Sequence, residues 1–475
     1  MKSNLIKNYI YNLSYQMLIL FVPLITTPYV SRVLQETNIG QFNFFQSIVS
    51  YFVLFGCIGL NLYGQREVAF CKDSVKKRSR VFWELTIIRF TTLTISVIAY
   101  FLLIVNNSKG FSLYYTLFSI EIFASFFDVS WFFQGLENFR LQTIRNVFVK
   151  IIGTVAIFLF VKTKNDLGIY IVCYPLTTLI GNLSMWICLP KYIKRVKTPL
   201  FGITKHIVPA LIMFVPQIAT SVYAYLDKTM IRLFSDYEQV AFYSQSEKIV
   251  KIVLTVVTSL GIVMLSRIAN SFSSGDQASI VQYIKKSFKF VFIIAYPCTF
   301  GLMAISGDMV PWFFGEGYEP VIPCMQILAP IILFIGVSNV IGTQYLLPTN
   351  RMKQYTISVC CGLIVNVMLN SVLIMRWGAM GAAVATVFAE LAVTTVQFIF
   401  VRKEFNAIEM IKNGKKSFVA GAVMGIAIYA LSLYLPPTVI STLIEIALGG
   451  ILYVILLFAL NERFIFDSAK KFLKG

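Results

Sequence analysis

The chain has 475 residues, of which 57% are hydrophobic and only 13% are charged. Soluble globular proteins usually carry about a quarter charged residues, so this composition excludes a soluble protein. The formal net charge of +19 would fit a nucleic-acid-binding protein, but the basic residues are spread over many short loops. We therefore expect no nucleic-acid partner.

Apolar stretches of about 20 residues recur along the whole chain, which is typical of helices that cross a lipid bilayer. The first of them, Ile10 to Val30, is long enough to span and lacks a small-residue cleavage site, so we expect no cleavable signal. The sequence predicts an all-α polytopic membrane protein with about fourteen transmembrane helices. In chain order they are residues 10–31, 39–64, 82–105, 111–134, 141–161, 167–189, 207–233, 240–266, 287–306, 322–346, 354–375, 379–401, 418–436 and 439–460.

The distribution of Lys and Arg predicts the topology of these spans. When the loops are alternated from a cytoplasmic N-terminus, most of the 41 basic residues fall on the cytoplasmic side, as at Lys76–Lys77 and Lys194–Arg195. Cytoplasmic loops of membrane proteins carry this excess of positive charge. We expect a multi-pass protein with both termini in the cytoplasm.

Two pairs of segments indicate an internal repeat. The segment "FFQGLENFRLQT" (132–143) is similar to "YLLPTNRMKQYT" (345–356), and "IGQFNFFQSIV" (39–49) is similar to "VAFYSQSEKIV" (240–250). Six predicted helices separate the members of each pair, which preserves their orientation. Repeated helical halves around a central cavity are typical of secondary transporters. We predict an N-terminal lobe (1–200, spans 1–6), a C-terminal lobe (201–405, spans 7–12) and two additional helices (406–475).

Charged side chains inside the predicted spans are candidates for function, because burying a charge in lipid is costly. In span 4, Glu121 and Asp128 are seven residues apart and would share a helix face with Trp131. Two further groups stand out. They are Asp227–Lys228 with Tyr223 and Tyr225 in span 7, and Lys248 beside the i,i+4 pair Glu247–Lys251 in span 8. A structural ion pair explains Glu247–Lys251 equally well, whereas Glu445 in span 14 is expected to lie solvated or lipid-facing near a helix end.

Prolines mark the first helix of each predicted lobe. Span 1 contains Pro23 and Pro28, and span 7 contains Pro209 and Pro216. A proline removes a backbone hydrogen bond and can bend a helix. We expect bent first helices, which would suit either a hinged gate or static packing.

Cysteine and histidine usage argues against a metal or cofactor site. The eight cysteines show no CxxC or CxxH spacing, and His206 is the only histidine. There is no P-loop or dinucleotide fingerprint. We expect no cofactor, no metal, no catalytic residues and no enzymatic activity.

Several motifs resemble one known family. These are "PLITTPYVSRVL" (23–34), "NLYGQREVA" (61–69), "DVSWFFQGLENF" (128–139), the Asp227–Lys228 pair and "AFYSQSEKI" (241–249). They are similar to motifs of the polysaccharide-biosynthesis flippases, the Wzx-type O-antigen and capsule branch of the multidrug/oligosaccharidyl-lipid/polysaccharide exporter (MOP) superfamily. The resemblance covers nearly the whole chain. One departure is Gln35, which stands where the family usually has glycine.

The resemblance implies alternating access in a bacterial plasma (inner) membrane. The substrate would be an undecaprenyl-pyrophosphate-linked oligosaccharide, moved from the cytoplasmic to the outer leaflet for O-antigen, capsule or exopolysaccharide synthesis. The implied partners are H⁺ or Na⁺ as coupling ion, the lipid bilayer, and the polymerase and chain-length proteins of the same pathway.

Three roles are expected for the candidate residues. Cationic side chains would bind the pyrophosphate or gate the cavity: Arg32, Arg66, Arg89, Lys228 and Lys248. Polar and aromatic side chains would contact sugars: Asp128, Trp131, Tyr223 and Tyr225. Carboxylates would bind the coupling ion: Glu121, Asp128 and Asp227.

Rival functions stay open at this point. A multidrug/cation antiporter of the same superfamily would favour a net acidic cavity, whereas here basic residues accompany the acids. Lipid II flipping is a second rival, although the motifs are more similar to the polysaccharide branch. A membrane-embedded polymerase or glycosyltransferase would typically carry a long extracytoplasmic loop, and the predicted spans leave none. A scaffold would not need buried charges in both lobes.

Overall fold

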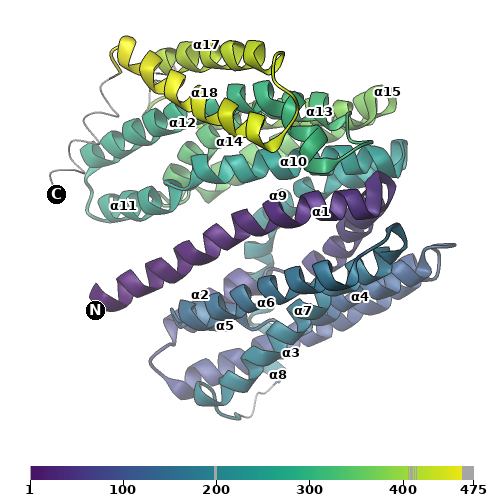
Figure 1. Cartoon of the computed structure of the whole chain (residues 1–475). Coiled ribbons are helices and arrows are strands. Elements are labelled where there is room, and N and C mark those ends of the chain that lie inside the picture. Colours follow the sequence, from purple (N-terminus) through teal and green to yellow (C-terminus); the bar gives the residue numbers. More distant parts are fainter. Residues whose placement is uncertain are drawn as a thin grey trace. The chain divides into compact units, whose positions relative to one another are not determined.

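The computed structural model describes the chain except residues 1, 197–199, 405, 407–409, 411, 413 and 463–475; the side chains of residues 2–20 and of a few later positions are also outside the description. The predicted cytoplasmic C-terminus therefore lies outside the described residues. The chain divides into two compact units, Met1–Arg232 and Leu233–Gly475. Every regular element in the described part is a helix (Figure 1).

The first unit contains nine α-helices and three short helical segments of other types. In chain order they are α1 (Lys2–Cys57), α2 (Leu60–Phe70), α3 (Val75–Tyr100), η1 (Phe101–Val105), α4 (Ser112–Phe126), α5 (Ser130–Gly135), α6 (Phe139–Phe160), η2 (Lys164–Asp166), α7 (Leu167–Cys188), η3 (Leu189–Lys191), α8 (Leu200–Thr204) and α9 (Ile207–Phe234), whose last two residues pass into the second unit.

The second unit is also helical throughout its described part. Its elements are α10 (Tyr237–Thr258), α11 (Gly261–Ser273), α12 (Gln277–Phe314), α13 (Val321–Leu328), α14 (Ile331–Ser338), η4 (Asn339–Leu346), α15 (Met352–Val401), α17 (Lys415–Ser432) and α18 (Val439–Ala459).

The helices match the predicted spans except at 240–266, which is not among the described segments that are long and apolar enough to cross a membrane. In the described part, ten helical segments are long and apolar enough to cross a membrane, or eleven if one bent pair counts as a single span. Two of these segments are 50 residues long, which as straight helices would measure about 75 Å, far more than the roughly 30 Å of a bilayer core. The segment Phe21–Phe70 is interrupted at Gln35 and again at Ile58–Gly59, and it covers one predicted span and part of another. The segment Met352–Val401 is interrupted at Gly378 and holds two predicted spans. The prediction of an all-α polytopic membrane protein is confirmed.

Four predicted spans are each divided between two α-helices. The span predicted at 39–64 breaks at Ile58–Gly59 between α1 and α2, and the span predicted at 322–346 breaks at Ala329–Pro330 between α13 and α14. The span predicted at 111–134 ends as α4 at Phe126 and resumes as α5 at Ser130. The span predicted at 240–266 breaks between α10 and α11, at Ser259–Leu260. Glycine or proline lies in or directly after three of these breaks, at Gly59, Gly261 and Pro330, whereas no strong helix-breaking residue marks the break after Phe126 in the sequence.

Bends were expected at the prolines of α1 and α9, and the structure has a bend at a proline only in α9. The backbone of α1 stays helical through Pro23 and Pro28, and its non-helical residue is Gln35. In contrast, the segment 202–215, which runs from α8 into α9, meets the rest of α9 (220–234) at a bend of 60°, and Pro216 falls in the interval between them. The bent first helix is therefore found at α9, whereas in α1 the kink lies after the prolines.

The kinks inside α1 and α15 use different residues. In α15 the kink is at Gly378, with φ 53° and ψ −125°. The chain turns sharply there, since a Cβ added at Gly381 would lie 2.2 Å from the carbonyl oxygen of Leu373. In α1 the kink residue Gln35 has φ 64° and ψ 172°. This conformation is favourable only for glycine, which is the residue that the resemblance leads one to expect at this position.

Replacing Gln35 with glycine should therefore stabilise the protein. Strain of this kind costs about 1–3 kcal/mol, and glycine regains most of it while adding flexibility to the unfolded chain. We expect Gln35→Gly to raise the free energy of unfolding by about 1 kcal/mol, seen as a higher Tm in detergent. Gln35→Ala keeps the Cβ and is the matched control. Equal Tm values for the two variants would contradict the claim that the backbone is strained at Gln35.

Each unit has its own hydrophobic core. In the first unit, buried side chains of α2, α3, α5, α7 and α9 pack together, including Phe82 and Trp131. In the second unit, α12, α17 and α18 share a core that includes Tyr453. The Tyr453 hydroxyl donates a 2.8 Å hydrogen bond to the carbonyl of Ile293, four residues before Pro297 in α12. Because proline has no N–H to bond this carbonyl, the tyrosine satisfies it instead.

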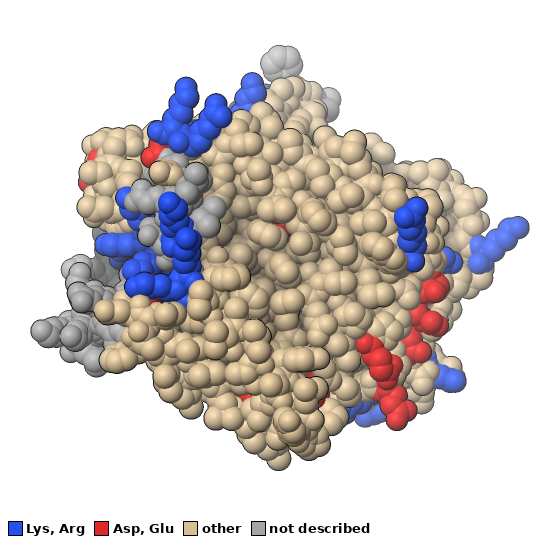
Figure 2. Space-filling model, turned by 90° about the horizontal axis from the view of Figure 1, so that it is seen from above, with Lys and Arg blue, Asp and Glu red and all other residues tan. Residues whose placement is uncertain are grey.

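The surface agrees with a membrane environment. Figure 2 shows a face covered mainly by uncharged residues, with Lys and Arg gathered toward its margins. Many large apolar side chains are exposed on the predicted spans, among them Ile187, Phe458 and Ile426. In water such surface would promote aggregation, whereas in lipid it is the expected exterior.

Candidate functional site: a broken helix around a buried arginine

The break between α4 and α5 is the main polar feature inside the first unit. The last carbonyls of a helix have no partner within the helix. Here three side chains from neighbouring helices donate to them. The Asn182 amide donates to the carbonyl of Ala124 at 2.7 Å, the Trp186 indole to that of Phe127 at 2.9 Å, and Arg89 Nε to that of Ser125 at 2.7 Å. The non-helical backbone is thus satisfied at membrane depth, as such a break requires.

Arg89 connects this break to the rest of the unit. Its side chain is 3% exposed, and Nη1 donates to Asn61 Oδ1 at 2.9 Å. Nη2 lies 3.5 Å from Asp128 Oδ2. The second oxygen of Asp128 accepts the backbone N–H of Ser130 at 2.9 Å, at the start of α5. A buried cation with this full set of partners holds three helices together.

Trp131 belongs to the hydrophobic core of the first unit. It is 2% exposed and stacks on Phe82, with ring centroids 5.7 Å apart. A Cβ added at Gly64 would lie 2.5 Å from the indole. Because α4 ends before Asp128, the helix face that was predicted to join Glu121, Asp128 and Trp131 does not exist.

A second polar network surrounds Glu84, which is fully buried in α3. Its carboxylate accepts from Arg80 Nε at 2.9 Å, Lys205 Nζ at 3.1 Å and His206 Nε2 at 2.9 Å. The other ring nitrogen of His206 lies 2.7 Å from the Tyr63 hydroxyl. The network ties the segment between α8 and α9 to α2 and α3.

Sequence reasoning missed this network, although two signals were present. Glu84 is a carboxylate inside a predicted span, which is itself a reason to look for a partner. His206 is the only histidine of the chain. The amide and indole donors at the helix break, Asn182 and Trp186, carried no comparable signal because the break itself was not predicted.

Two of the predicted cationic residues are exposed. Arg32 lies on α1, three residues before the kink at Gln35. Arg66 lies on α2, where it pairs with Glu67 at 3.1 Å and sits 5.5 Å from the ring centre of Tyr63. Both side chains can therefore reach a ligand outside the core of this unit, unlike Arg89.

The predicted residues of α9 are partly or fully buried. Asp227 is 4% exposed, while Tyr223, Tyr225 and Lys228 are half-buried. Tyr225 packs edge-on against Tyr51 of α1, with ring centroids 5.8 Å apart. Tyr225 therefore lies on a side of α9 that contacts α1.

The remaining predicted residues are spread over both units. Lys248 is half-buried on α10, and the ion pair predicted beside it is confirmed, with Glu247 and Lys251 2.5 Å apart. In α4, Glu121 is half-buried, and its Oε2 has no hydrogen-bond partner among the described residues. Among the predicted residues of the first unit, the structure joins Arg89 with Asp128, and the described hydrogen-bond and ion-pair partners of this pair do not include Arg32, Arg66 or Glu121. Lys248 belongs to the second unit.

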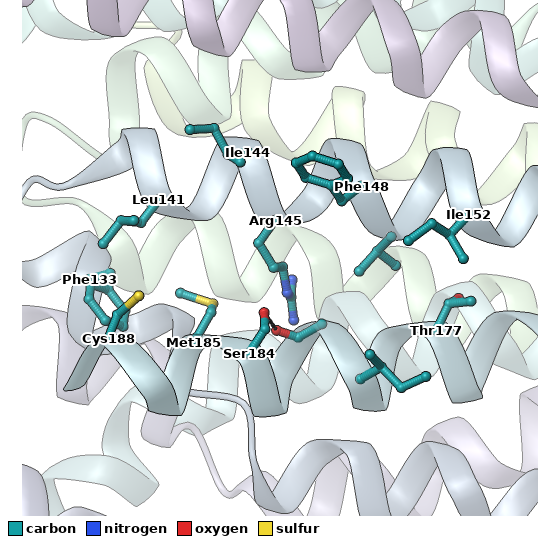
Figure 3. Close-up of a pocket in the computed structure, with 13 residues that line it drawn as sticks. Phe133, Leu141, Ile144, Arg145, Phe148, Ile152, Thr177, Ser184, Met185 and Cys188 are labelled. Atoms are coloured by element: carbon teal, nitrogen blue, oxygen red, sulfur yellow. Dashed lines mark hydrogen bonds between the residues drawn. The ribbon is translucent and has the colours of Figure 1, made fainter. Parts of the chain in front are cut away.

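An apolar cavity of about 420 Å³ lies between α6 and α7 (Figure 3). Phe148 and Ile152 line it from α6, and Met185 lines it from α7. Arg145 is the one charged residue in its lining, and its Nε is buried without a hydrogen-bond partner in the described part of the chain. The cavity suits a hydrocarbon chain better than a polar molecule.

The fold and the buried polar break define a multi-pass α-helical membrane protein. The sequence places it more narrowly. Residues 5–272, more than half of the chain, match the family model described as "Polysaccharide biosynthesis protein". The chain belongs to this family.

Curated relatives and solved structures agree with this assignment. An Escherichia coli (strain K12) protein named "Putative O-antigen transporter" is 24% identical over 407 residues, which cover 84% of this chain and 97% of that protein. The lipid II flippase MurJ of Bacillus subtilis (strain 168) is 25% identical over 187 residues, 38% of this chain and 34% of that protein.

The fold is also that of known transporters. A structure of the lipid II flippase MurJ in an inward closed conformation has a TM-score of 0.75 at 16% identity, covering 97% of this chain and 100% of the other. An inward-facing MATE-family multidrug transporter of the MOP superfamily has a TM-score of 0.66 at 14% identity, covering 86% and 99%.

Proposed function

We propose that the protein flips undecaprenyl-pyrophosphate-linked oligosaccharides from the cytoplasmic to the outer leaflet of a bacterial plasma membrane. The flipped repeat units would be used for O-antigen, capsule or exopolysaccharide. The family match and the name of the Escherichia coli relative support the substrate class. Transport would proceed by alternating access with H⁺ or Na⁺ as coupling ion, and the polymerase and chain-length proteins of the pathway would be partners.

One observation carries the proposal at the level of residues. The first unit presents the exposed Arg32 and Arg66 on helices that are otherwise largely apolar. A guanidinium binds phosphate oxygens in a bidentate manner and does so most strongly where little water competes. We assign these two arginines to the pyrophosphate. Lys228 and Lys248 are assigned to gating, and Asp227 and Glu121 are candidates for the coupling ion.

The two residues at the helix break receive a supporting role. Arg89 and Asp128 are engaged with each other and with the backbone, so they hold the broken helix in place. Tyr223 and Tyr225 remain the proposed contacts for sugar rings, because they are half-buried rather than enclosed. Trp131 contributes packing.

Replacing Arg32 with alanine tests the assignment. We expect Arg32→Ala to reduce polymer export at least tenfold, the equivalent of losing about 1.4 kcal/mol of binding, with unchanged amounts of protein in the membrane. Export is measured as surface polysaccharide in a strain that lacks the chromosomal copy. Arg376→Ala is the matched control, since Arg376 is also exposed and lies two residues before the kink at Gly378. A wild-type amount of surface polysaccharide in the Arg32→Ala strain would show that Arg32 does not bind the pyrophosphate.

A multidrug/cation antiporter is the second candidate function. The MATE-family neighbour favours it, as does the Glu121 oxygen that has no donor among the described residues. The two functions separate in one experiment. Expression in a drug-sensitive strain should leave resistance unchanged if the protein is a flippase, and raise it if the protein is an antiporter.

A further inference from the structure

The geometry points to a proton-binding site in the second unit, formed by the carboxyl groups of Asp308 in α12 and Glu445 in α18. The site is separate from the residues assigned to the substrate or to the coupling ion. It does not depend on the proposed transport function.

The first observation is the burial of Glu445. Its side chain is 1% exposed, although its place near the start of α18 led us to expect contact with solvent or lipid. Both of its carboxyl oxygens are buried and have no hydrogen-bond donor among the described residues. An isolated ionised carboxylate in such a place would cost several kcal/mol.

The second observation is a facing carboxyl group. Asp308 lies within hydrogen-bonding range of Glu445, and its Oδ2 is also buried without a donor among the described residues. Two carboxylates at this separation cannot both be ionised. One shared proton removes this repulsion, because a protonated carboxyl group donates a hydrogen bond to an ionised one.

The packing of α12 against α18 holds the two carboxyl groups next to each other. On one side of the pair, the Trp312 indole donates to Thr442 Oγ1 at 2.9 Å. On the other side, Tyr453 bonds Ile293, and beyond it Lys289 pairs with Glu462 at 2.6 Å. These contacts show that α12 and α18 run antiparallel, so residues later in α18 contact residues earlier in α12. Asp308 and Glu445 are held between them. The helices α12, α17 and α18 lie together in Figure 1.

No described cation faces the pair. On α12, Lys289 is occupied by Glu462 at the opposite end of the contact, and Lys285 and Lys286 lie still further from Asp308 along the helix. On α17 the charged residues are Lys415 and Lys416 at its first turn, and Lys416 donates to the carbonyl of Asn461. The Cys298 thiol lines one cavity with Glu445, and Val253 of α10 also borders this cavity. The charged residue of α10 nearest to Val253 in the chain is Lys251, which pairs with Glu247.

That cavity gives a route for chemical detection. It measures about 290 Å³ and is bordered by Gly301, Gly449 and other apolar residues. N,N′-dicyclohexylcarbodiimide is an apolar reagent that adds to the protonated form of a carboxyl group. The carboxyl O–H adds across a C=N bond, so the proton moves to nitrogen and no group leaves. The adduct rearranges to a stable N-acylurea, which mass spectrometry locates.

The experiment labels the full-length protein in membrane vesicles with this reagent between pH 6 and pH 9. We expect Glu445 to be labelled at pH 7, and the labelling to fall at least tenfold as the pH rises. Asp308→Asn should reduce labelling at pH 7, because the new amide can donate to an ionised Glu445. Glu445→Gln should lose the label, and the exposed Glu319 should show none at neutral pH.

Two results would overturn the proposal. The first is absence of label on Glu445 while an apolar maleimide still alkylates Cys298, which would show that the cavity is open but the carboxyl holds no proton. The second is protection of Glu445 by Na⁺ at constant pH, which would assign the pair to a metal cation. Both readouts are independent of polysaccharide export, so a failure here leaves the flippase proposal to be tested separately.

Discussion

Arg89→Ala should lower the free energy of unfolding by about 3–5 kcal/mol, the usual cost of removing one partner from a buried ion pair. The substitution leaves Asp128 without its guanidinium. It also removes the hydrogen bonds to Asn61 and to the carbonyl of Ser125. We expect a large loss of folded protein, measured by size-exclusion chromatography and thermal unfolding in detergent.

A pair of controls distinguishes a buried network from a general effect of charge. Arg66→Ala removes an arginine whose ion pair with Glu67 is exposed, and should change stability by less than about 1 kcal/mol. In a double-mutant cycle, Arg89→Ala combined with Asp128→Ala should cost less than the sum of the two single substitutions. Additive costs would show that the pair is not coupled.

Glu84→Ala should be the second most damaging substitution, with an expected loss of about 3 kcal/mol. Glu84 is fully buried and is the common acceptor of Arg80, Lys205 and His206. Arg80 and Lys205 are about half exposed and can turn to solvent, but His206 is 2% exposed and would be left without its acceptor.

The experiment compares Glu84→Ala with Glu84→Gln. Glutamine keeps an oxygen acceptor for His206. Glu84→Gln should therefore lower the free energy of unfolding by about half as much as Glu84→Ala. The Tyr63 hydroxyl that bonds the other ring nitrogen offers a further check. If Glu84→Ala and Glu84→Gln unfold at the wild-type temperature, the network does not stabilise the first unit.

Much of the fold could be predicted from the sequence because the membrane restricts the options. Apolar stretches of about 20 residues give the helices, and only helices satisfy their own backbone in lipid. The breaks were harder to predict. Pro23 and Pro28 suggested a bend in α1, yet the kink lies at Gln35, whose backbone has a glycine-like conformation. The break after Phe126 has no helix-breaking residue, and donors on α3 and α7 stabilise it.

The candidate site was only partly predictable. Arg89 and Asp128 were recognised as costly charges inside spans, but a one-dimensional pattern does not show that they face each other. Glu445 was expected to be solvated or lipid-facing near the end of an added helix. It is buried instead, and Asp308, well over 100 residues earlier in the chain, lies against it. Partners that come from distant segments are what the sequence alone does not reveal.

The central claim is movement of a lipid-linked oligosaccharide between leaflets, and the leaflet distribution of that lipid tests it most directly. Vesicles of known orientation are prepared from a strain that lacks the gene and from the same strain carrying the wild-type protein. An impermeant glycosidase or lectin then measures the fraction of lipid-linked repeat units at the outer face. The account predicts that these units accumulate in the cytoplasmic leaflet without the protein and reach the outer leaflet when it is restored. An unchanged distribution in the two strains would contradict it.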